Sequence, residues 1–449
     1  MKSPSIKFSR IPLLGTDCYT DLRWILLLFP VWWVLGFEQF IWPVLLLWVV
    51  VKLLIRKQFK LRIPPLAGAF ALFLISQLFS AIFISASFRY ISFIRTFSTF
   101  FSVLLLTLIF ENADFSDQEN GNLIDTVLIS ISMAGLLGLM AELGLWRPKV
   151  NSLISYLLPA AVKNTSYGSV IAYRSLGNPS WFSGLGSYFR LSSLFLYPTL
   201  YGSALAFVLP IGFYRFAYPS KVWTKPRSFL LIAVMLYNLI YTTGRTAILS
   251  FLLAGLLFLW FFSKQKTQYR LLLILLASLI LISFILVSFL DLAVFDQIVE
   301  LLSSFLYARG EGTVVSRLSI YGNTLEDFLR RPLWGWGTER DIEGIKIPLG
   351  SHSFYLALLY RFGLAGFSIY CFILLKIWVS LVGIRKPIEG ADADGFLRYV
   401  KWVVLAGFLD GLFTVPLLDI NTLMFFWIPV ILGLNWVMTG KNRSSIPED

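Results

Sequence analysis

Apolar residues recur along the chain in long runs that short polar segments separate. A run of roughly 18 apolar residues is long enough for a helix to cross a hydrocarbon core of about 30 Å. The pattern predicts about twelve such helices. They fall at 22–37, 39–55, 64–86, 89–110, 122–145, 193–214, 228–244, 246–263, 270–290, 363–383, 399–418 and 421–439. We therefore expect an all-α polytopic membrane protein.

Two long segments, 146–190 and 291–350, interrupt this series of apolar runs. In the second segment, apolar positions at helical spacing over 296–307 and 314–330 predict two amphipathic helices that lie along the membrane interface. The sequence LWGWG, which follows Pro332, predicts a tight turn after the second of these helices.

The apolar run at 351–383 is too long for one span. As a single helix it would measure about 50 Å. It would also place Arg361 inside the membrane, which costs a few kcal/mol for an unpaired charge. A break at Gly363 or Gly366 avoids both problems, and it leaves 351–361 as a short helix outside the bilayer.

Composition excludes a soluble globular domain. Hydrophobic residues make up 57% of the chain and charged residues 14%, whereas soluble domains carry about 25% charged residues. The two cysteines, Cys18 and Cys371, have neither a disulfide nor a metal-site spacing.

The net charge of +13 could indicate a nucleic-acid partner, but the positions of the basic residues argue against one. Lys and Arg cluster before the first apolar run and after the second, sixth, eighth, tenth and twelfth, all on one side of the membrane if the N-terminus is cytoplasmic. Both termini are therefore expected in the cytoplasm, and 146–190 and 291–350 on the opposite side. No A-x-A site follows the first run, so we expect that run to stay as a span.

Arginines on that opposite side are the candidate ligand-binding residues. Arg190 precedes the run at 193–214, Arg245 lies between two runs, and Arg317 lies in the second long segment. Guanidinium groups stay charged and bind phosphate oxygens bidentately, so together they suit a diphosphate whose negative charge grows as it leaves. The alternative is that each arginine reaches up from a helix end to lipid phosphate.

The single histidine, His352, stands at the head of the short helix at 351–361. A neutral imidazole can take a proton from an attacking hydroxyl. The alternative is a helix-start residue without chemistry, next to Ser351 as the cap.

Further candidates for substrate contact are mostly aromatic, although each ring is equally typical of an anchor at the membrane interface. They are Tyr321, Trp334, Trp336 and Arg361, with Trp181 and Phe182 as additional aromatic surfaces.

Four stretches resemble the O-antigen ligase and polymerase superfamily. They are FRLSSLFLYPTLYGSALAF at 189–207, GRTAILS at 244–250, SRLSIYGNTLEDFLRRPLWGWG at 316–337 and SHSFYLALLYRFGLAGF at 351–367. The most specific element is the order R…P…G-x-G, H-S-x-x-L and G-x-x-G, which uses Arg317, Pro332, Gly335, Gly337, His352, Leu356, Gly363 and Gly366. The resemblance divides the chain into N-terminal helices with the first outer loop (1–188), a catalytic region (189–383) and C-terminal helices with a tail (384–449).

The resemblance implies a glycosyltransferase of GT-C-type architecture in the bacterial inner membrane, with a large periplasmic helical loop and a periplasmic active site. Such enzymes move a glycan from undecaprenyl diphosphate to an acceptor hydroxyl, with inversion and without a metal or cofactor. Arg190, Arg245 and Arg317 would hold the diphosphate, and His352 would activate the acceptor. The acceptor is lipid A–core for a ligase and another glycan for a polymerase, and both remain open. The superfamily often carries an acidic or polar residue where this chain has Arg361, which leaves the acceptor side open.

Two other functions compete with this one. A transporter or flippase of lipid-linked glycan or of a small solute would also suit many spans and the charges Arg95 and Asp410 inside predicted spans, but no internal repeat supports it. Asp392 and Asp394 could form a D-x-D metal site for a nucleotide sugar, although a solvated turn is the simpler interpretation.

Overall fold

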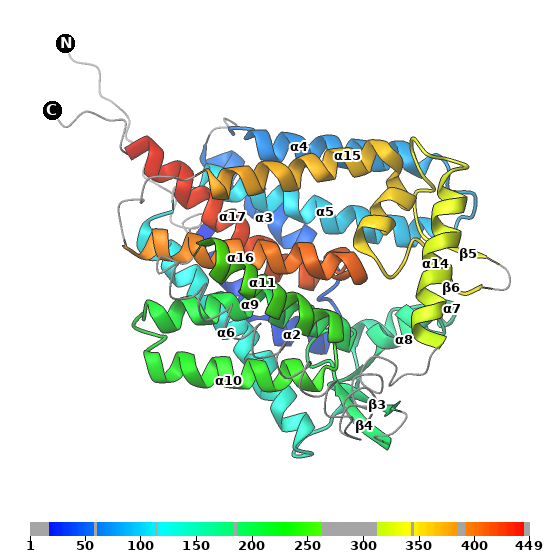
Figure 1. The fold of residues 1–449 in the computed structure, drawn as a ribbon, viewed down its shortest axis with the longest axis horizontal. Helices are drawn as coiled ribbons and strands as arrows, with labels where there is room; N and C mark the ends of the chain where they lie inside the picture. Colours follow the sequence, from blue (N-terminus) through cyan, green and yellow to red (C-terminus); the bar gives the residue numbers. More distant parts are fainter. Residues whose placement is uncertain are drawn as a thin grey trace, which may run out of the picture.

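The structure, a computed structural model, describes residues 18–57, 61–113, 115–182, 186–262, 312–342, 345–383 and 391–443. Long helices run side by side, and short helices and strands gather at one end of them (Figure 1). The long helices are α1 (Cys18–Leu27), α2 (Phe29–Leu35), α3 (Ile41–Arg56), α4 (Pro65–Ala81), α5 (Arg89–Asn112), α6 (Asp117–Glu142), α9 (Pro198–Ala217), α10 (Lys225–Tyr241), α11 (Arg245–Phe262), α15 (Phe354–Val382), α16 (Ala391–Phe413) and α17 (Ile420–Arg443).

Helices long and apolar enough to cross a membrane are present. In the part of the chain that the structure describes, these are α5, α6, α9 and α15, or five spans if the bent pair α1 and α2 counts as one. Shorter apolar helices accompany them at Pro65–Ala81, Arg245–Phe261 and Ile420–Trp436. The mostly helical membrane protein is thus confirmed, whereas the total of about twelve spans stays a prediction. The predicted helices at 270–290 and 296–307 lie outside the described residues.

Proline sets several helix starts. It occupies the first turn of α4, α9 and α10, where a backbone N–H is not needed. At 22–37 the prediction of one continuous helix is wrong, because α1 and α2 meet at a bend of 55° and Pro30 opens α2. Helix α9 begins at Pro198 rather than at 193, because Ser193 has a left-handed backbone with φ 46°.

The strands, the short helices beside them and α14 form what we call the hairpin end. They are β1 (Lys149–Asn151), η2 (Leu153–Tyr156), α7 (Ala160–Lys163), α8 (Ser166–Ala172), β2 (Tyr173–Ser175), β3 (Gly177–Phe182), β4 (Gly186–Leu191), α14 (Gly312–Phe328), β5 (Arg340–Ile342), β6 (Ile345–Leu349) and η3 (Pro416–Leu418). The strands pair as three antiparallel two-stranded sheets, β1–β2, β3–β4 and β5–β6. Helix α14 confirms the helix predicted at 314–330. The sheets correct the all-α expectation; strands of 3 to 6 residues are too short to show alternation in the sequence.

Helix α9 occupies the middle of the bundle, since 78% of its apolar window is buried. Elsewhere in the bundle, side chains from helices that are far apart in the sequence pack against one another. One example is the aromatic cluster of Phe73, Phe100 and Tyr370, whose ring centroids lie 4.9 to 5.8 Å apart. The division at 188 and 383 stays a prediction, and hydrogen bonds join its first and last parts, such as Trp42 Nε1 to Asn421 Oδ1 at 2.8 Å.

Candidate functional site

Helix α15 breaks at Gly363, where φ is 64° and ψ −169°. This confirms the predicted break. A break inside an apolar helix leaves backbone groups without partners, and these must be satisfied locally. The turn at 332–337 satisfies them through Trp336 N to Tyr360 O at 3.0 Å, Gly337 N to Arg361 O at 2.7 Å, Leu364 N to Pro332 O at 2.8 Å and Ala365 N to Leu333 O at 3.1 Å.

The turn at 332–337 and the break in α15 lie so close together that glycine is required in both. Gly335 and Gly337 have φ values of 70° and 76°. A Cβ on Gly335 would lie 2.6 Å from the Gly363 nitrogen, and a Cβ on Gly363 would lie 2.2 Å from the Leu333 oxygen. The G-x-G turn and the glycine of the helix break are therefore two halves of one backbone contact.

His352 lies between strand β6 and helix α15 on a left-handed backbone with φ 65°, a conformation that is uncommon and strained for a non-glycine residue. The Tyr321 hydroxyl, from α14, donates to the His352 carbonyl at 3.0 Å. The helix cap is Ser353, whose Oγ accepts from Leu356 N at 3.5 Å. The expected cap, Ser351, instead donates to Pro348 O at 2.6 Å.

Helix α16 fixes the start of α15 from another side. Phe354 N donates to Thr414 O at 2.9 Å, and the Tyr355 hydroxyl donates to Phe408 O at 3.2 Å. His352 is thus held between α14, the β5–β6 hairpin and the end of α16.

Arg190 and the start of α11 come together at the hairpin end. Arg190 lies on β4, and its Nε donates to Thr243 Oγ1 at 2.8 Å and to Thr242 O at 3.3 Å. These threonines form the turn before Arg245, the first residue of α11. The structure thereby brings two of the three predicted diphosphate ligands to one place.

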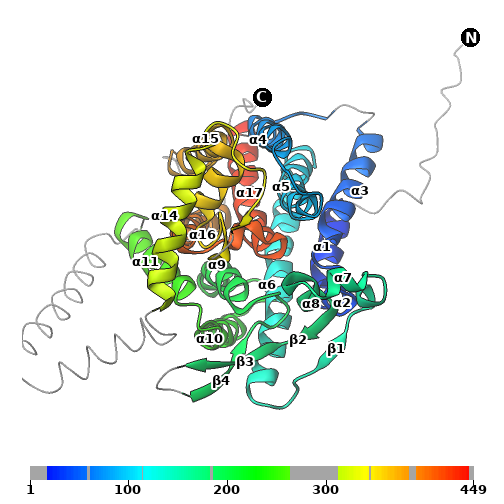
Figure 2. The same cartoon turned by 90° about the vertical axis from the view of Figure 1, so that its right-hand side faces the viewer.

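The third, Arg317, lies on α14 one turn before Tyr321 and on the same helix face. Its side chain is outside the described set. Helix α14 lies across the end of the bundle at which α11 begins (Figures 1 and 2). Arg190 and Arg317 therefore lie on elements of the hairpin end, whereas Arg245 begins the bundle helix α11.

The aromatic candidates make protein contacts here. Trp334 packs on Phe79 at 5.0 Å between ring centroids. Trp336 donates from Nε1 to Asp327 O at 3.2 Å, and guanidinium carbons of two arginines lie 4.2 and 3.7 Å from its ring centroid. Trp181 and Phe182 lie on β3. Their roles as substrate contacts stay predictions.

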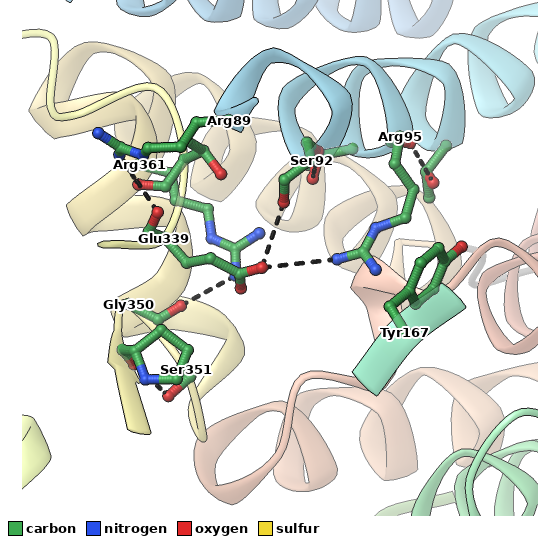
Figure 3. A network of polar contacts seen from close by, with 12 residues as sticks. Arg89, Ser92, Arg95, Tyr167, Glu339, Gly350, Ser351 and Arg361 are labelled. Atoms are coloured by element: carbon green, nitrogen blue, oxygen red, sulfur yellow. Dashed lines mark hydrogen bonds and ion pairs between the residues drawn. The ribbon is translucent and has the colours of Figure 1, made fainter. Parts of the chain in front are cut away.

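Arg361 lies in a polar network that sequence reasoning did not foresee (Figure 3). Its side chain is 2% exposed, and its Nη2 donates to Glu339 Oε2 at 2.7 Å and to Gly350 O at 3.1 Å. Glu339 also faces Arg95 Nη2 at 3.8 Å and accepts from Ser92 Oγ at 3.2 Å.

The charges decide the protonation of Glu339. Burial acts to raise the pKa of this carboxyl, but Arg361 and Arg95 outweigh burial and hold the pKa below its ordinary value. Glu339 is therefore ionised at neutral pH and is the counter-charge of two arginines.

The two charges inside predicted spans have separate surroundings. Arg95 pairs with Glu339, whereas the fully buried Asp410 lies with the hydroxyls of Ser203, Thr246 and Thr414. Among the described residues, Arg95 and Asp410 form no ion pair with each other.

The D-x-D sequence lies on the first turn of α16 rather than in a solvated turn, and Asp394 forms an ion pair with Arg398. Among the described residues no group of His, Cys, Asp and Glu could hold a metal ion.

A cavity of about 220 Å³ opens near the first loop, lined by Trp33, Tyr173, Arg174, Asn178 and Phe195 among others. Arg174 pairs with the buried Glu38 at 2.7 Å. Neither residue has a position or spacing in the sequence that predicts this pair.

Comparison with known proteins identifies one segment. Residues 230–371 match the family model described as O-Antigen ligase. The segment contains Arg245, Arg317, His352 and the break at Gly363, whereas Arg190 lies outside it. No curated protein matches the chain.

Proposed function

Because residues 230–371 match the O-antigen ligase family model, we propose that the chain is a member of the O-antigen ligase and polymerase superfamily and that it transfers a glycan from undecaprenyl diphosphate to an acceptor hydroxyl. The reaction takes place on the periplasmic side of the bacterial inner membrane, at the hairpin end. The acceptor is lipid A–core or the end of another lipid-linked glycan. We also propose GT-C architecture with about twelve spans.

The arginines stabilise the leaving group in this proposal. Arg190 and Arg245 come from separate elements that meet at the 242–245 turn. As the bond between the anomeric carbon and the diphosphate oxygen breaks, its electron pair passes to the diphosphate, and preorganised guanidinium groups stabilise the growing charge. Arg317 approaches from α14. The guanidinium groups supply the counter-charge, so the scheme includes no metal or cofactor.

His352 acts as the general base. The acceptor oxygen attacks the anomeric carbon from the face opposite the diphosphate, which inverts the configuration, and the hydroxyl proton passes to the imidazole. Such assistance is typically worth about a hundred- to ten-thousand-fold in rate. The strained backbone at His352, held by Tyr321, favours a role that needs a fixed imidazole.

One observation carries the proposal. The matched segment contains His352 on a turn that three elements fix, and that turn lies at the same end of the bundle as the contact of Arg190 with Thr242 and Thr243, just before Arg245.

Product analysis tests the proposed function. Purified protein in nanodiscs is supplied with undecaprenyl-diphosphate oligosaccharide, with or without lipid A–core, and the products are resolved by glycan length on gels. Glycan on lipid A–core identifies a ligase, and a ladder of longer lipid-linked glycan identifies a polymerase. Arms with EDTA should give the same product as arms without it. If neither product forms with either acceptor, the proposal fails.

A further inference from the structure

Arg361 closes the base of the β5–β6 hairpin. Its guanidinium group donates to Glu339, the residue before β5, and to the carbonyl of Gly350, the residue after β6. The Arg361 carbonyl also accepts from Gly337 N at 2.7 Å. Arg361 therefore contacts the chain at three points: Gly337 before the hairpin, Glu339 where the hairpin begins and Gly350 where it ends.

The hairpin exit leads directly to the proposed base. Gly350 is separated from His352 by Ser351 alone, and both Gly350 and His352 have left-handed backbones, with φ 75° and 65°. Movement of the Gly350 carbonyl would therefore change the direction in which the backbone presents His352.

Helix α5 holds the same carboxylate from the other side (Figure 3). Arg95 faces Glu339 Oε1, and its guanidinium lies 4.5 Å from the ring centroid of Tyr167 on α8. Arg89 Nη2 donates to the Glu339 carbonyl at 3.2 Å. Glu339 thus ties the hairpin to both α15 and α5.

We propose that Arg361 and Glu339 are positioning residues for His352, and that the Arg361–Glu339–Arg95 network fixes the turn that carries the imidazole. The inference rests on the proposed role of His352. It places Arg361 behind the base, so that Arg361 acts through His352 and not through a substrate contact.

A test of the Arg361–Glu339 ion pair should replace both residues at once. In Arg361 the Nε and Nη1 atoms have no hydrogen-bond partner among the described residues, so Glu339 and Gly350 satisfy this buried charge. Removing one partner would leave the other charge buried and uncompensated. The double variant Arg361→Met/Glu339→Gln removes both charges. Arg361→Lys keeps the charge but replaces the planar guanidinium group, whose Nη2 donates to both acceptors, with a compact ammonium group.

The test measures kcat and KM in nanodiscs with the undecaprenyl-diphosphate oligosaccharide and whichever acceptor gives product. We expect Arg361→Met/Glu339→Gln to lower kcat about a hundred-fold, because a displacement of about 1 Å can cost that much, with KM for the donor unchanged. Arg361→Lys should fall between this variant and wild type. The matched control is Arg330→Met, which removes a 70% exposed arginine of the same loop and should leave kcat unchanged.

A double-mutant cycle separates positioning from direct contact. If Arg361 acts through His352, adding the Arg361→Met/Glu339→Gln changes to His352→Ala should lower kcat no further. Hydrogen exchange at 349–354 should be faster in Arg361→Met/Glu339→Gln than in wild type, and it should be unchanged in the control Arg330→Met. Additive losses, or a raised donor KM with unchanged kcat, would overturn the inference. If His352→Ala itself has no effect, the proposed function fails instead. If Arg361→Met/Glu339→Gln does not fold, the same cycle with His352→Ala is measured for Arg361→Lys and tests the inference in its place.

Discussion

The helix bundle and the hairpin end are held together by different kinds of contact. In the bundle, many apolar side chains each contribute a small part of the packing. Phe73, for example, packs edge-on against Phe100 and Phe362, with 4.9 and 5.7 Å between ring centroids. At the hairpin end, single hydrogen bonds and ion pairs hold backbone segments in left-handed conformations. Dispersion contacts are individually small and numerous, whereas a buried ion pair depends on both partners. The bundle should therefore tolerate single substitutions that the hairpin end does not.

The largest expected effect comes from one methyl group at the break in α15, where the helix meets the turn at 332–337. Gly363→Ala would bring a Cβ to 2.2 Å from the Leu333 oxygen at a positive φ, which we expect to cost at least about 3 kcal/mol of stability. Thermal unfolding in detergent measures the loss.

The matched control lies in the bundle. Gly68, in α4, has nothing within 4 Å of an added Cβ, so Gly68→Ala should be neutral or stabilise by about 0.5–1 kcal/mol. Equal unfolding temperatures for the two variants would contradict the contrast between the regions.

Arg190→Gln should lower kcat/KM about ten- to a hundred-fold, because a charged hydrogen bond contributes about 1.5–3 kcal/mol. Steady-state transfer assays measure the change. Arg227→Gln is the control, since Arg227 is exposed at the start of α10 and, among the described residues, donates to the nearby Val222 O. An Arg190 variant as active as the Arg227 variant would remove Arg190 from the site.

Tyr321→Phe deletes the hydrogen bond to the His352 carbonyl. A loss of about 1 kcal/mol corresponds to a fall in kcat of about fivefold. Tyr90→Phe, which loses an exposed bond to Ala81 O, should leave kcat unaltered. If the two variants behave alike, the Tyr321 bond does not hold the site.

The smallest effect at neutral pH concerns Glu339. Because its pKa is lower in the folded protein than in the unfolded chain, its ionised form stabilises the fold above the ordinary carboxyl range of about 4.3. That stabilisation is lost as the pH falls through the folded pKa. The protection factor for hydrogen exchange at 349–354, which corrects for the intrinsic pH dependence of exchange, should stay constant from neutral pH down to that range and fall below it, and Glu339→Gln should remove this acid step. A fall that begins near neutral pH would mean that Glu339 is not ionised there.

The same contrast explains what the sequence could predict. Hydropathy located the bundle closely: the run at 89–110 is α5 at Arg89–Asn112. The break in α15 could be predicted because the apolar run is too long for one span and contains Gly363. Both features are visible in the local sequence, without knowledge of any other segment. Glu339 and Arg361 are a pair that only the folded hairpin brings together, and neither has a spacing that reveals the other. The left-handed backbone of His352 and the cap by Ser353 likewise depend on tertiary contacts, with Tyr321 and Thr414.

The most direct test of the account is the dependence of kcat on pH for wild type and His352→Gln in the transfer assay. An imidazole acts as a general base only in its neutral form. The account predicts that wild-type kcat rises with pH as the imidazole loses its proton and then levels off. His352→Gln should lower kcat by about a hundred- to ten-thousand-fold and abolish the rise. A variant that keeps the wild-type kcat and the wild-type pH profile would contradict the assignment of His352 as the base.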